Sequence, residues 1–592
     1  MDNSKPTRFR FGPFELDVDT SEVFESGHPS PLQSKPLQFL ATLLQRHGEL
    51  VTREQMSHVL WPDIYVQVNQ GLNAAARKVR IALHDEVSSP KYFETLGSKG
   101  YKFIHPVEIL RWSHELPTAG ETGIRIAVLP FESNDGGPNG KGLTAELIGL
   151  LGRVHPRIRV IAPSTMLQWT AETDPRAFAA ELGAEYALTG KVHRDRGKLS
   201  VRSQFTDVRT GQTKVERHVE KPLSELCNIV EDLAREVVET LQPGFIPQGA
   251  TPPECSKTKT SCYMDYLDAK EAWNCRSGAE LNNVLTELRR IANSDPGFAP
   301  AHAGVAITLV RLANLELAAP RAAYHSALQA AEKALELCPD MPDALVAAAW
   351  ATLAVDHDWA AATRMYERVL RANPSHVLAY TGYGLLLLSR GRSDDAVRMM
   401  ERAADLDPLS PNTVSALATA YYYVRRYDDA VRLARRTLEL QENHPVGHAV
   451  LGISLLMQRR FSDAMQSLES AFSHSGGDPV MEAHLAHAYA RSGNISGAQQ
   501  ILTRLENRNG NLPRPSFHIS LIRLALNDVT GALRWLELAC QERFQRTLFL
   551  SVDPRLDVLR GTKQFEELCR QVREPDLRRV NSGRLSSRGG AA

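Results

Sequence analysis

The sequence predicts a multidomain chain with three folded regions: an α+β domain, then a small α/β domain, and then an all-α solenoid. Its 592 residues are about four times the ~150 residues of a typical domain, and 43% hydrophobic with 23% charged residues is an ordinary globular composition. The apolar run at residues 124–131 has the pattern of a buried strand. Small residues recur at a fixed distance in the second half of the chain, which indicates helical repeats.

Polar stretches that contain Pro and Gly divide the chain. We expect linkers at residues 108–123 and 243–259, and a disordered tail, rich in Arg, Ser and Gly, at residues 571–592. The folded regions are then residues 1–107, 124–242 and 260–570.

The composition excludes few classes of function but indicates the cellular compartment. Lys plus Arg and Asp plus Glu both number 69, so the formal charge of zero neither favours nor excludes nucleic acid. The seven cysteines include no C-x-x-C pair and fit a reducing compartment. A metal site at Cys255, Cys262 and Cys275 is an alternative that their spacing disfavours. The longest apolar run, residues 344–355, is too short to cross ~30 Å of hydrocarbon, so we expect a cytoplasmic protein without a membrane segment.

The repeats predict a tetratricopeptide array. The gaps between seven alanines are 35 and then 34 five times over: Ala327, Ala362, Ala396, Ala430, Ala464, Ala498 and Ala532. A period of 34 residues is that of the tetratricopeptide helix–turn–helix unit, and a small residue is needed where its two helices cross. An ordinary alanine-rich bundle does not explain the equal gaps. With a degenerate first unit around Leu267, Val284, Leu288 and Pro296 and a closing one at residues 532–569, we expect about eight helical pairs.

Such an array curves and offers a concave groove for a protein or peptide. We therefore expect a protein or peptide partner in the groove. The residues that line the groove are left open, since the sequence shows packing positions better than contact positions.

In the first region, the helix expected at residues 68–83 has two unlike faces. Leu72, Ala76, Val79 and Leu83 recur at helical spacing and should face the core. Another face carries polar and basic side chains with no acidic residue among them: Asn69, Asn73, Arg77, Lys78 and Arg80. Arginine suits guanine edges and asparagine suits adenine, with the remaining cations on phosphate, so this face could read DNA. A solvated helix face without a ligand is the alternative.

The whole first region resembles the OmpR/PhoB-type winged helix. The matching pieces are FGPFELD at residues 11–17, a helix at 32–47, GELVTREQ at 48–55 with Thr52 capping a helix that ends near 60–62, the helix at 68–83, and a wing at 93–103. The resemblance implies binding of double-stranded DNA and transcription regulation in a bacterial cell. On the wing it implies contacts from Lys99 and Lys102.

Two departures from the family modify this expectation. Family members usually carry an arginine where this chain has Gly97, so a minor-groove contact should be weaker or move to Lys99. Residues 1–107 hold 12 Lys/Arg and 12 Asp/Glu, so one copy should bind modestly and a homodimer or tandem arrangement is expected. We also expect no receiver domain, an order similar to the CadC/ToxR type but without its membrane span.

The middle region resembles the TolB N-terminal-like α/β domain, which implies no catalysis. Its loop at residues 136–142 has three residues between Gly136 and Gly140, where a Walker loop needs four, and Gly142 follows the lysine. We therefore expect a plain strand–helix loop. His484 and His487, three residues apart, should be packing or surface residues rather than metal ligands.

These observations lead to one functional prediction and two alternatives. The prediction is a sequence-specific transcriptional regulator in signal transduction, without enzymatic activity and with no cofactor. The first alternative is an interaction scaffold whose winged helix docks a protein, for example RNA polymerase. The second is an enzyme hidden in residues 124–242, for which the sequence offers no catalytic motif.

Overall fold

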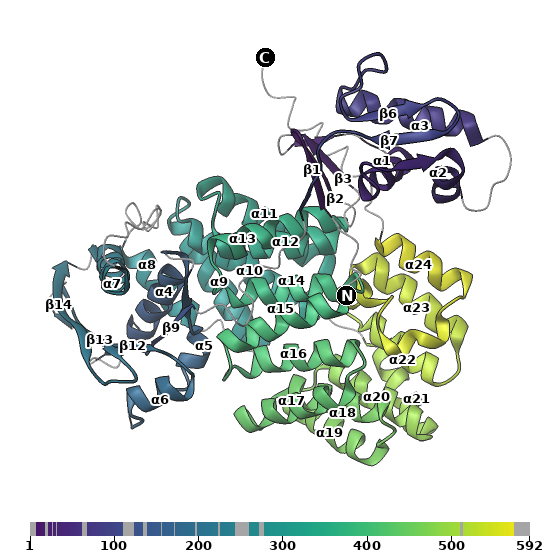
Figure 1. Ribbon diagram of the computed structural model, residues 1–592. Helices are drawn as coiled ribbons and strands as arrows, with labels where there is room; N and C mark the ends of the chain where they lie inside the picture. The colour runs from purple at the N-terminus through teal and green to yellow at the C-terminus, as the bar shows by residue number, and fades with distance from the viewer. Residues whose placement is uncertain are drawn as a thin grey trace. The chain divides into compact units, whose positions relative to one another are not determined.

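The computed structural model describes residues 8–17, 22–25, 28–30, 32, 34–61, 68–110, 123–133, 139–154, 157–170, 172–195, 198–222, 225–242, 260–271, 278–508 and 513–573. The chain divides into two compact units, Met1–Glu121 and Thr122–Ala592 (Figure 1).

The first unit begins with an antiparallel sheet in the order β4-β3-β2-β1-β8. Its strands are β1 (Arg8–Phe11), β2 (Phe14–Asp17), β3 (Glu22–Glu25), β4 (His28–Ser30) and β8 (Glu108–Leu110). The strand β8 is a correction, because residues 108–110 were expected in a linker. It pairs with the free edge of β1, a tertiary partner that local polarity does not reveal.

The rest of the first unit has the helices and the wing that the sequence predicts. The elements are α1 (Ser34–Gln45), β5 (Leu50–Thr52), α2 (Arg53–Leu60), α3 (Val68–Leu83), β6 (Phe93–Leu96) and β7 (Gly100–Phe103), with β7 between β5 and β6. Aromatic rings fill the core: Phe9, Phe11, Phe14, Phe39, Phe93, Tyr101 and Phe103 are all buried. Each such ring contributes roughly 1.5–3 kcal/mol by leaving water, so this small unit has a substantial core of its own.

The second unit opens with the expected α/β domain. Strand β9 lies between β11 and β12 and runs parallel to both, while β12, β13 and β14 form an antiparallel meander. On β13, buried side chains alternate with more exposed ones, because one face of the sheet is covered by α4 and α7. The elements are β9 (Ile124–Val128), β10 (Glu132–Ser133), α4 (Asn139–Val154), β11 (Ile158–Val160), α5 (Pro163–Met166), α6 (Pro175–Glu181), β12 (Tyr186–Asp195), β13 (Lys198–Asp207), β14 (Thr213–Pro222) and α7 (Leu226–Leu241).

The helical array confirms the repeat prediction, with eight helix pairs in the described part of the chain. The pairs are α8 (Thr260–Glu271) with α9 (Gly278–Ser294), α10 (Ala299–Asn314) with α11 (Pro320–Leu337), α12 (Pro342–Asp356) with α13 (Trp359–Ala372), α14 (Val377–Ser389) with α15 (Ser393–Leu406), α16 (Pro411–Tyr423) with α17 (Tyr427–Leu440), α18 (Pro445–Met457) with α19 (Phe461–His474), α20 (Pro479–Ser492) with α21 (Ile495–Glu506), and α22 (Ser516–Ala525) with α23 (Val529–Glu542). The first pair buries Leu267, Val284 and Leu288, as predicted.

The end of the array differs from the prediction of a closing repeat at residues 532–569. Ala532 belongs to the second helix of the eighth pair. The chain then forms two 3₁₀ turns, η4 (Gln545–Phe549) and η5 (Pro554–Leu559), before α24 (Lys563–Arg573) packs on α23.

The spaced alanines lie where the two helices of a pair cross. All seven have no exposed surface. A Cβ added at Gly384 would lie 3.2 Å from the Ala396 carbonyl oxygen, and one at Gly452 would lie 3.1 Å from that of Ala464. The backbones therefore approach too closely for larger side chains, which is the physical reason for the 34-residue period.

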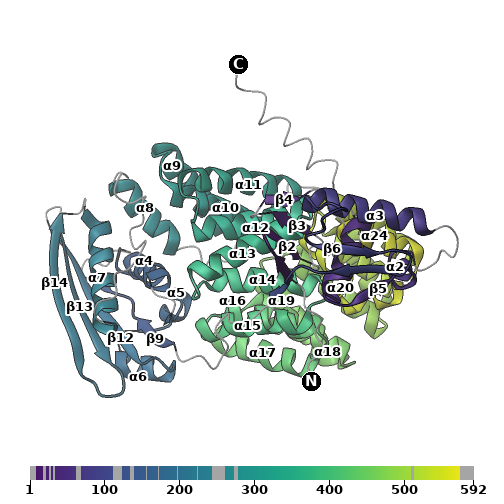
Figure 2. The same cartoon turned by 45° about the horizontal axis from the view of Figure 1, so that its top comes forward.

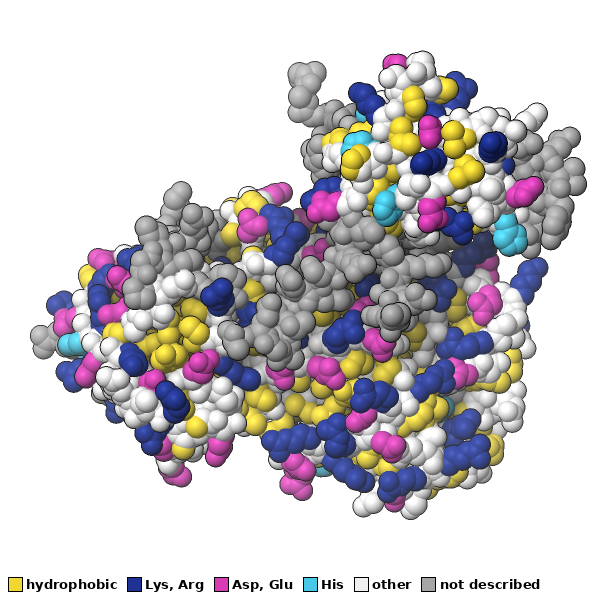
Figure 3. Space-filling view, in the orientation of Figure 1, with side chains coloured by type: hydrophobic (Ala, Val, Ile, Leu, Met, Phe, Trp, Pro, Cys, Tyr) yellow, Lys and Arg dark blue, Asp and Glu magenta, His cyan; other side chains and the backbone are white. Residues whose placement is uncertain are grey.

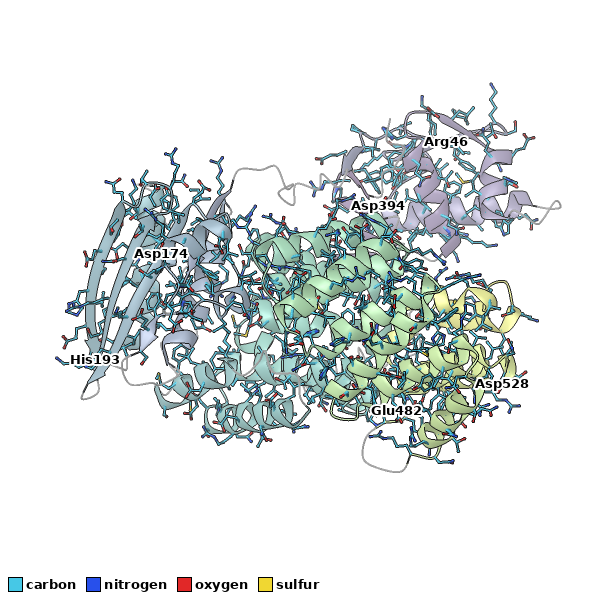
Figure 4. The ribbon with its side chains drawn as sticks, turned by 90° about the horizontal axis from the view of Figure 1, so that it is seen from below. Arg46, Asp174, His193, Asp394, Glu482 and Asp528 are labelled. Atoms are coloured by element: carbon cyan, nitrogen blue, oxygen red, sulfur yellow. The ribbon has the colours of Figure 1, made fainter. Side chains whose placement is uncertain are left out.

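Six of the second helices begin with one of two recurring devices. In α13, α21 and α23 an Asp or Asn side chain caps the helix, as Asp528 does by accepting from the Gly531 amide at 2.9 Å. Figure 4 labels Asp528 among the side chains of the array. In the other device an arginine pairs with an aspartate three residues later, at 34-residue intervals: Arg392–Asp395, Arg426–Asp429 and Arg460–Asp463. Figure 3 shows basic and acidic side chains side by side over the face of the array that it draws.

The α/β domain and the array form one unit through buried polar contacts. The Asp407 carboxylate, at the end of α15, accepts hydrogen bonds from the hydroxyls of Ser164 (2.7 Å), Thr165 (2.8 Å) and Thr413 (2.7 Å). The Ala162 amide donates to the Leu406 carbonyl at 2.8 Å. Figures 1 and 2 both show α5 beside α15 and α16. The expected linker at residues 243–259 lies outside the described residues, and the domain after it is docked onto the domain before it.

A segment of the same chain contacts the first helices of the pairs, which the sequence did not predict. The segment at residues 543–560, named the plug from here on, lies against the first helices of several pairs. The Phe549 ring stacks on Tyr423 of α16 at 5.0 Å, and the Ser551 hydroxyl donates to the carbonyl of Ser389, at the end of α14, at 3.5 Å. The repeat pattern describes how helices pack on each other and says nothing of the segment after the last repeat, so it could not reveal the plug.

None of the helices within the described ranges has the length and apolar character needed to cross a membrane.

Candidate nucleic-acid interface

Helix α2 is fixed at its start by the cap that the sequence predicts. The Thr52 hydroxyl accepts from the Gln55 amide at 3.2 Å, and the Gln55 side chain accepts from the Thr52 amide at 3.0 Å. This reciprocal capping box satisfies two amides that the first turn of a helix leaves without partners. It places Arg53, the first residue of α2, at the junction between α2, α3 and the wing.

Helix α3 presents one face to the core and another to solvent. Leu72, Ala76, Val79 and Leu83 are buried, as predicted. Asn73, Arg77 and Lys78 are exposed. Within the described residues, neither Arg77 nor Lys78 forms a hydrogen bond or an ion pair. Their charges therefore remain available to a ligand.

Arg80 does not belong to this exposed face, which corrects the sequence prediction. Its side chain is only 8% exposed and forms an ion pair with the fully buried Asp85 carboxylate at 2.9 Å. It also donates to the Thr95 hydroxyl at 3.2 Å and lies 4.1 Å from the centre of the Phe93 ring. Burial lowers the pKa of Arg80, and the Asp85 charge opposes this shift. Arg80 thus joins the end of α3 to β6 and cannot reach a base in this conformation.

Asn73 is held in place by its neighbours. Its side-chain oxygen accepts from both terminal nitrogens of Arg53, at 3.3 Å each, and from the Tyr101 hydroxyl at 3.3 Å. A bidentate contact with adenine uses both the oxygen and the amide nitrogen of asparagine. Asn73 would therefore have to exchange its Arg53 and Tyr101 contacts for base contacts.

The wing turn explains Gly97, where the family usually carries an arginine. Gly97 has φ +55°, and the Lys99 amide donates to the Leu96 carbonyl at 3.0 Å, so the chain makes the tight hairpin turn that favours glycine at this position. The Lys99 carbonyl accepts from the Arg53 amide at 3.3 Å, which ties the turn to the start of α2. The Lys99 side chain is exposed and that of Lys102 is half-buried, opposite Glu94.

The remaining predicted residue, Asn69, is in the first turn of α3, but its side chain lies outside the described residues. Sequence reasoning missed Arg53, whose guanidinium contacts Asn73 and the Gly97 carbonyl. Its position directly after a capping residue was the available signal, because the first turn of a helix often faces a ligand anion.

The sequence suggested three further sites to consider in the second unit: the glycine loop, the three cysteines and the histidine pair. A Cβ at Gly140 would lie 2.1 Å from the Phe131 carbonyl oxygen, and one at Gly142 would lie 2.7 Å from Leu267. Close packing therefore explains why glycine occupies both positions. Residues 134–138 of that loop, and Cys255 and Cys275, lie outside the described residues. His484 and His487 are buried, and no metal-binding group of three side chains occurs within the described ranges.

Comparison with known proteins assigns these regions. Residues 27–103 match the family described as "Transcriptional regulatory protein, C terminal", and tetratricopeptide repeat families match residues 352–411, 415–478 and 455–516.

Relatives extend over different parts of the chain. It is 22% identical over 422 residues to "Transcriptional regulator HilA" of Salmonella typhimurium, which covers 70% of this chain and 74% of that protein. It is 31% identical over 87 residues to the transcriptional regulatory protein YcbL of Bacillus subtilis, 15% of this chain and 38% of that protein. A putative adenylate cyclase of Rhizobium meliloti is 26% identical over 272 residues, 40% of this chain and 46% of that protein.

The TolB resemblance of the middle domain remains a prediction, since the solved TolB of Acinetobacter baumannii matches 22% of this chain with a TM-score of only 0.18. The domain matches are clear for the other two regions. The chain carries an OmpR/PhoB-type winged-helix DNA-binding domain of the transcriptional regulatory family, followed by tetratricopeptide repeats.

Proposed function

We propose that this chain is a sequence-specific transcriptional regulator in the cytoplasm, in which α3 enters the major groove of DNA and the repeat array binds a protein partner. The observation that carries the proposal is the pair of exposed cations Arg77 and Lys78, which have no partner in the part of the chain that the structure describes, on a helix whose opposite face is packed in the core. The likeness to proteins named as transcriptional regulators supports it.

The roles that we propose divide the interface into reading and positioning residues. Arg77 contacts a guanine edge, and Asn69 and Asn73 contact neighbouring bases. Lys78, Lys99 and Lys102 contact phosphates, and Arg53 joins them at the start of α2. Arg80 is left out because it is buried. Among the described residues, two cations of α3 are exposed without a partner, and residues 1–107 have no net charge, so one copy binds modestly and two copies bind together, as a homodimer or in tandem.

The test is DNA binding by the full chain, first to select preferred sequences from a random pool and then to measure affinity by fluorescence anisotropy. Arg77→Ala should weaken binding to the selected site by about 1–3 kcal/mol, or roughly 5–150-fold, and relax the base preference at one position. Arg10→Ala is the matched control, since Arg10 lies on β1 and pairs with Glu15. Equal loss in both variants would reject the reading face.

Salt dependence separates this function from a protein-docking winged helix. Phosphate contacts release counterions, so affinity for DNA should fall steeply with salt, and Lys78→Ala should reduce the slope by about one. If the winged helix instead docks a protein such as RNA polymerase, the selection yields no preferred sequence and the slope is near zero.

A further inference from the structure

The array curves so far that its second and eighth helix pairs meet. Glu316, just after α10, lies 3.7 Å from His518 of α22, counted between the Glu316 Oε1 and His518 Nδ1 atoms. Both side chains are buried. The plug lies among the first helices of the pairs, since it contacts residues of α14, α16 and α22 and the residue that ends α12.

The plug is anchored by apolar side chains and by contacts at its edges. Six apolar side chains are at most 4% exposed: Phe544, Leu548, Phe549, Leu550, Leu556 and Leu559. At the edges, Asp557 forms a two-fold ion pair with Arg425 (2.6 and 2.8 Å), and Arg543 donates to the His357 ring at 2.7 Å. The Arg425 pair is half exposed, so this edge of the plug is open to solvent.

The plug does not satisfy the polar groups that it covers. Among the described residues, buried polar atoms without a hydrogen-bond partner gather where the plug meets the array: Arg555 Nη1, Tyr422 OH, His487 Nδ1, both ring nitrogens of His518, and Glu316 Oε2. Arg555 belongs to the plug and lies over the Tyr422 and Phe517 rings, while the others belong to the array. Buried polar groups without partners cost free energy, so the plug is an imperfect ligand of this surface.

The plug meets the array chiefly through arginine and aromatic side chains. Arg546 donates to the Tyr423 hydroxyl at 3.2 Å, and Arg555 lies over the Tyr422 and Phe517 rings. The plug also carries two carboxylates: Asp553 pairs with Arg555, and Asp557 pairs with Arg425 of the array. Burial is the main cause of the rise of the Glu316 pKa to about 8, so this buried side chain is mostly protonated at neutral pH and can donate a hydrogen bond. The side chains of the plug that contact the array are thus chiefly basic and aromatic.

We propose that the plug is a built-in, exchangeable ligand of the array, and that a protein partner binds by inserting a basic and aromatic segment in its place. This inference rests on the proposed function only in taking the array as the partner-binding part of a regulator. The unsatisfied Glu316, His487, His518 and Tyr422 are the positions at which a partner makes contacts that the plug does not.

The first test measures exchange at the inner surface. In a variant of the full chain, residues 544–559 are replaced by a Gly/Ser linker of equal length, which keeps α23 and α24. A fluorescent peptide with the sequence of residues 543–560 should bind this variant roughly 100-fold or more tightly than the wild type, where the tethered plug competes at high effective concentration. The same peptide with alanine at the positions of Arg546 and Arg555 should bind the variant at least tenfold more weakly. Failure of the unmodified peptide to bind a variant of wild-type helicity overturns the proposal.

A second test can be carried out even if the linker variant does not fold. Arg425→Ala removes the half-exposed anchor without touching the apolar contacts. Arg426→Ala is the matched control, since Arg426 pairs with Asp429 of its own helix. Hydrogen exchange of residues 543–560 should become several-fold faster in the first variant and stay unchanged in the second. Equal exchange in both variants and the wild type means that the plug is a permanent part of the fold. Neither test uses DNA, so their failure is separate from failure of the DNA-binding proposal.

Discussion

The exposed face of α3 and the plug inside the array both carry arginines, but the surroundings of these arginines differ. Arg77 on α3 is exposed and has no partner within the described residues. Arg555 inside the array is 3% exposed and forms an ion pair with the fully buried Asp553 at 2.6 Å. The exposed Arg77 keeps its charge available to a ligand at little cost in stability. The buried Arg555, in contrast, makes the stability of the fold depend on its ion pair with Asp553. A basic residue in the sequence is therefore evidence for binding only when no carboxylate of the same chain covers it.

The largest effect should follow from breaking the buried pair. Asp553→Ala leaves Arg555 buried without its carboxylate, which should lower the free energy of unfolding by about 3–5 kcal/mol. Urea unfolding of the full chain, followed by the helical signal at 222 nm, measures it. Asp553→Ala combined with Arg555→Met removes both charges and should recover most of the loss. A loss below about 1 kcal/mol in the single variant would mean that water reaches Arg555.

The next effect separates the two arginines of α3. Arg80→Ala leaves Asp85 buried with the amides of Lys91 and Phe93 as its remaining donors among the described residues, so we expect the free energy of unfolding of the first unit to fall by about 2–4 kcal/mol. Arg77→Ala should change that stability by no more than about 0.5 kcal/mol, because it is a surface substitution. Thermal unfolding measured alongside DNA affinity distinguishes them. A destabilised Arg77→Ala variant would contradict its assignment as a free side chain.

The smallest effect concerns the recurring surface pairs. Arg460 and Asp463 are 48% and 49% exposed, so solvent screens their attraction. Arg460→Ala should change the free energy of unfolding by about 0.5 kcal/mol or less, as measured by the same urea experiment. A much larger loss would show that the pairs at 34-residue intervals support the array together rather than one by one.

The sequence predicted what local spacing controls. The seven alanines lie at the helix crossings, and Leu72, Val79 and Leu83 face the core, because helical periodicity fixes both without knowledge of the rest of the chain. Arg80 was misplaced because it shares the helical face of Asn73, and its partners Asp85 and Thr95 come from segments that fold back over the end of α3.

The docking of the α/β domain and the position of the plug could not be predicted from the sequence for a related reason. Asp407 joins residues more than 240 positions away, and the plug contacts four first helices whose ends come together only after the array has curved. No local pattern encodes such contacts. Equally, the pattern could not say that Gly97 replaces an arginine because its backbone has a positive φ.

The shared carboxylate of Asp407 has a practical consequence for dissecting this protein. A fragment that starts at residue 260 keeps Asp407 and Thr413 but loses Ser164 and Thr165, two of the three hydroxyl donors, together with the Ala162 amide that donates to the Leu406 carbonyl. An expression fragment intended to isolate the repeats should therefore begin near residue 122, where the second unit begins. The shorter fragment should aggregate or melt at a lower temperature.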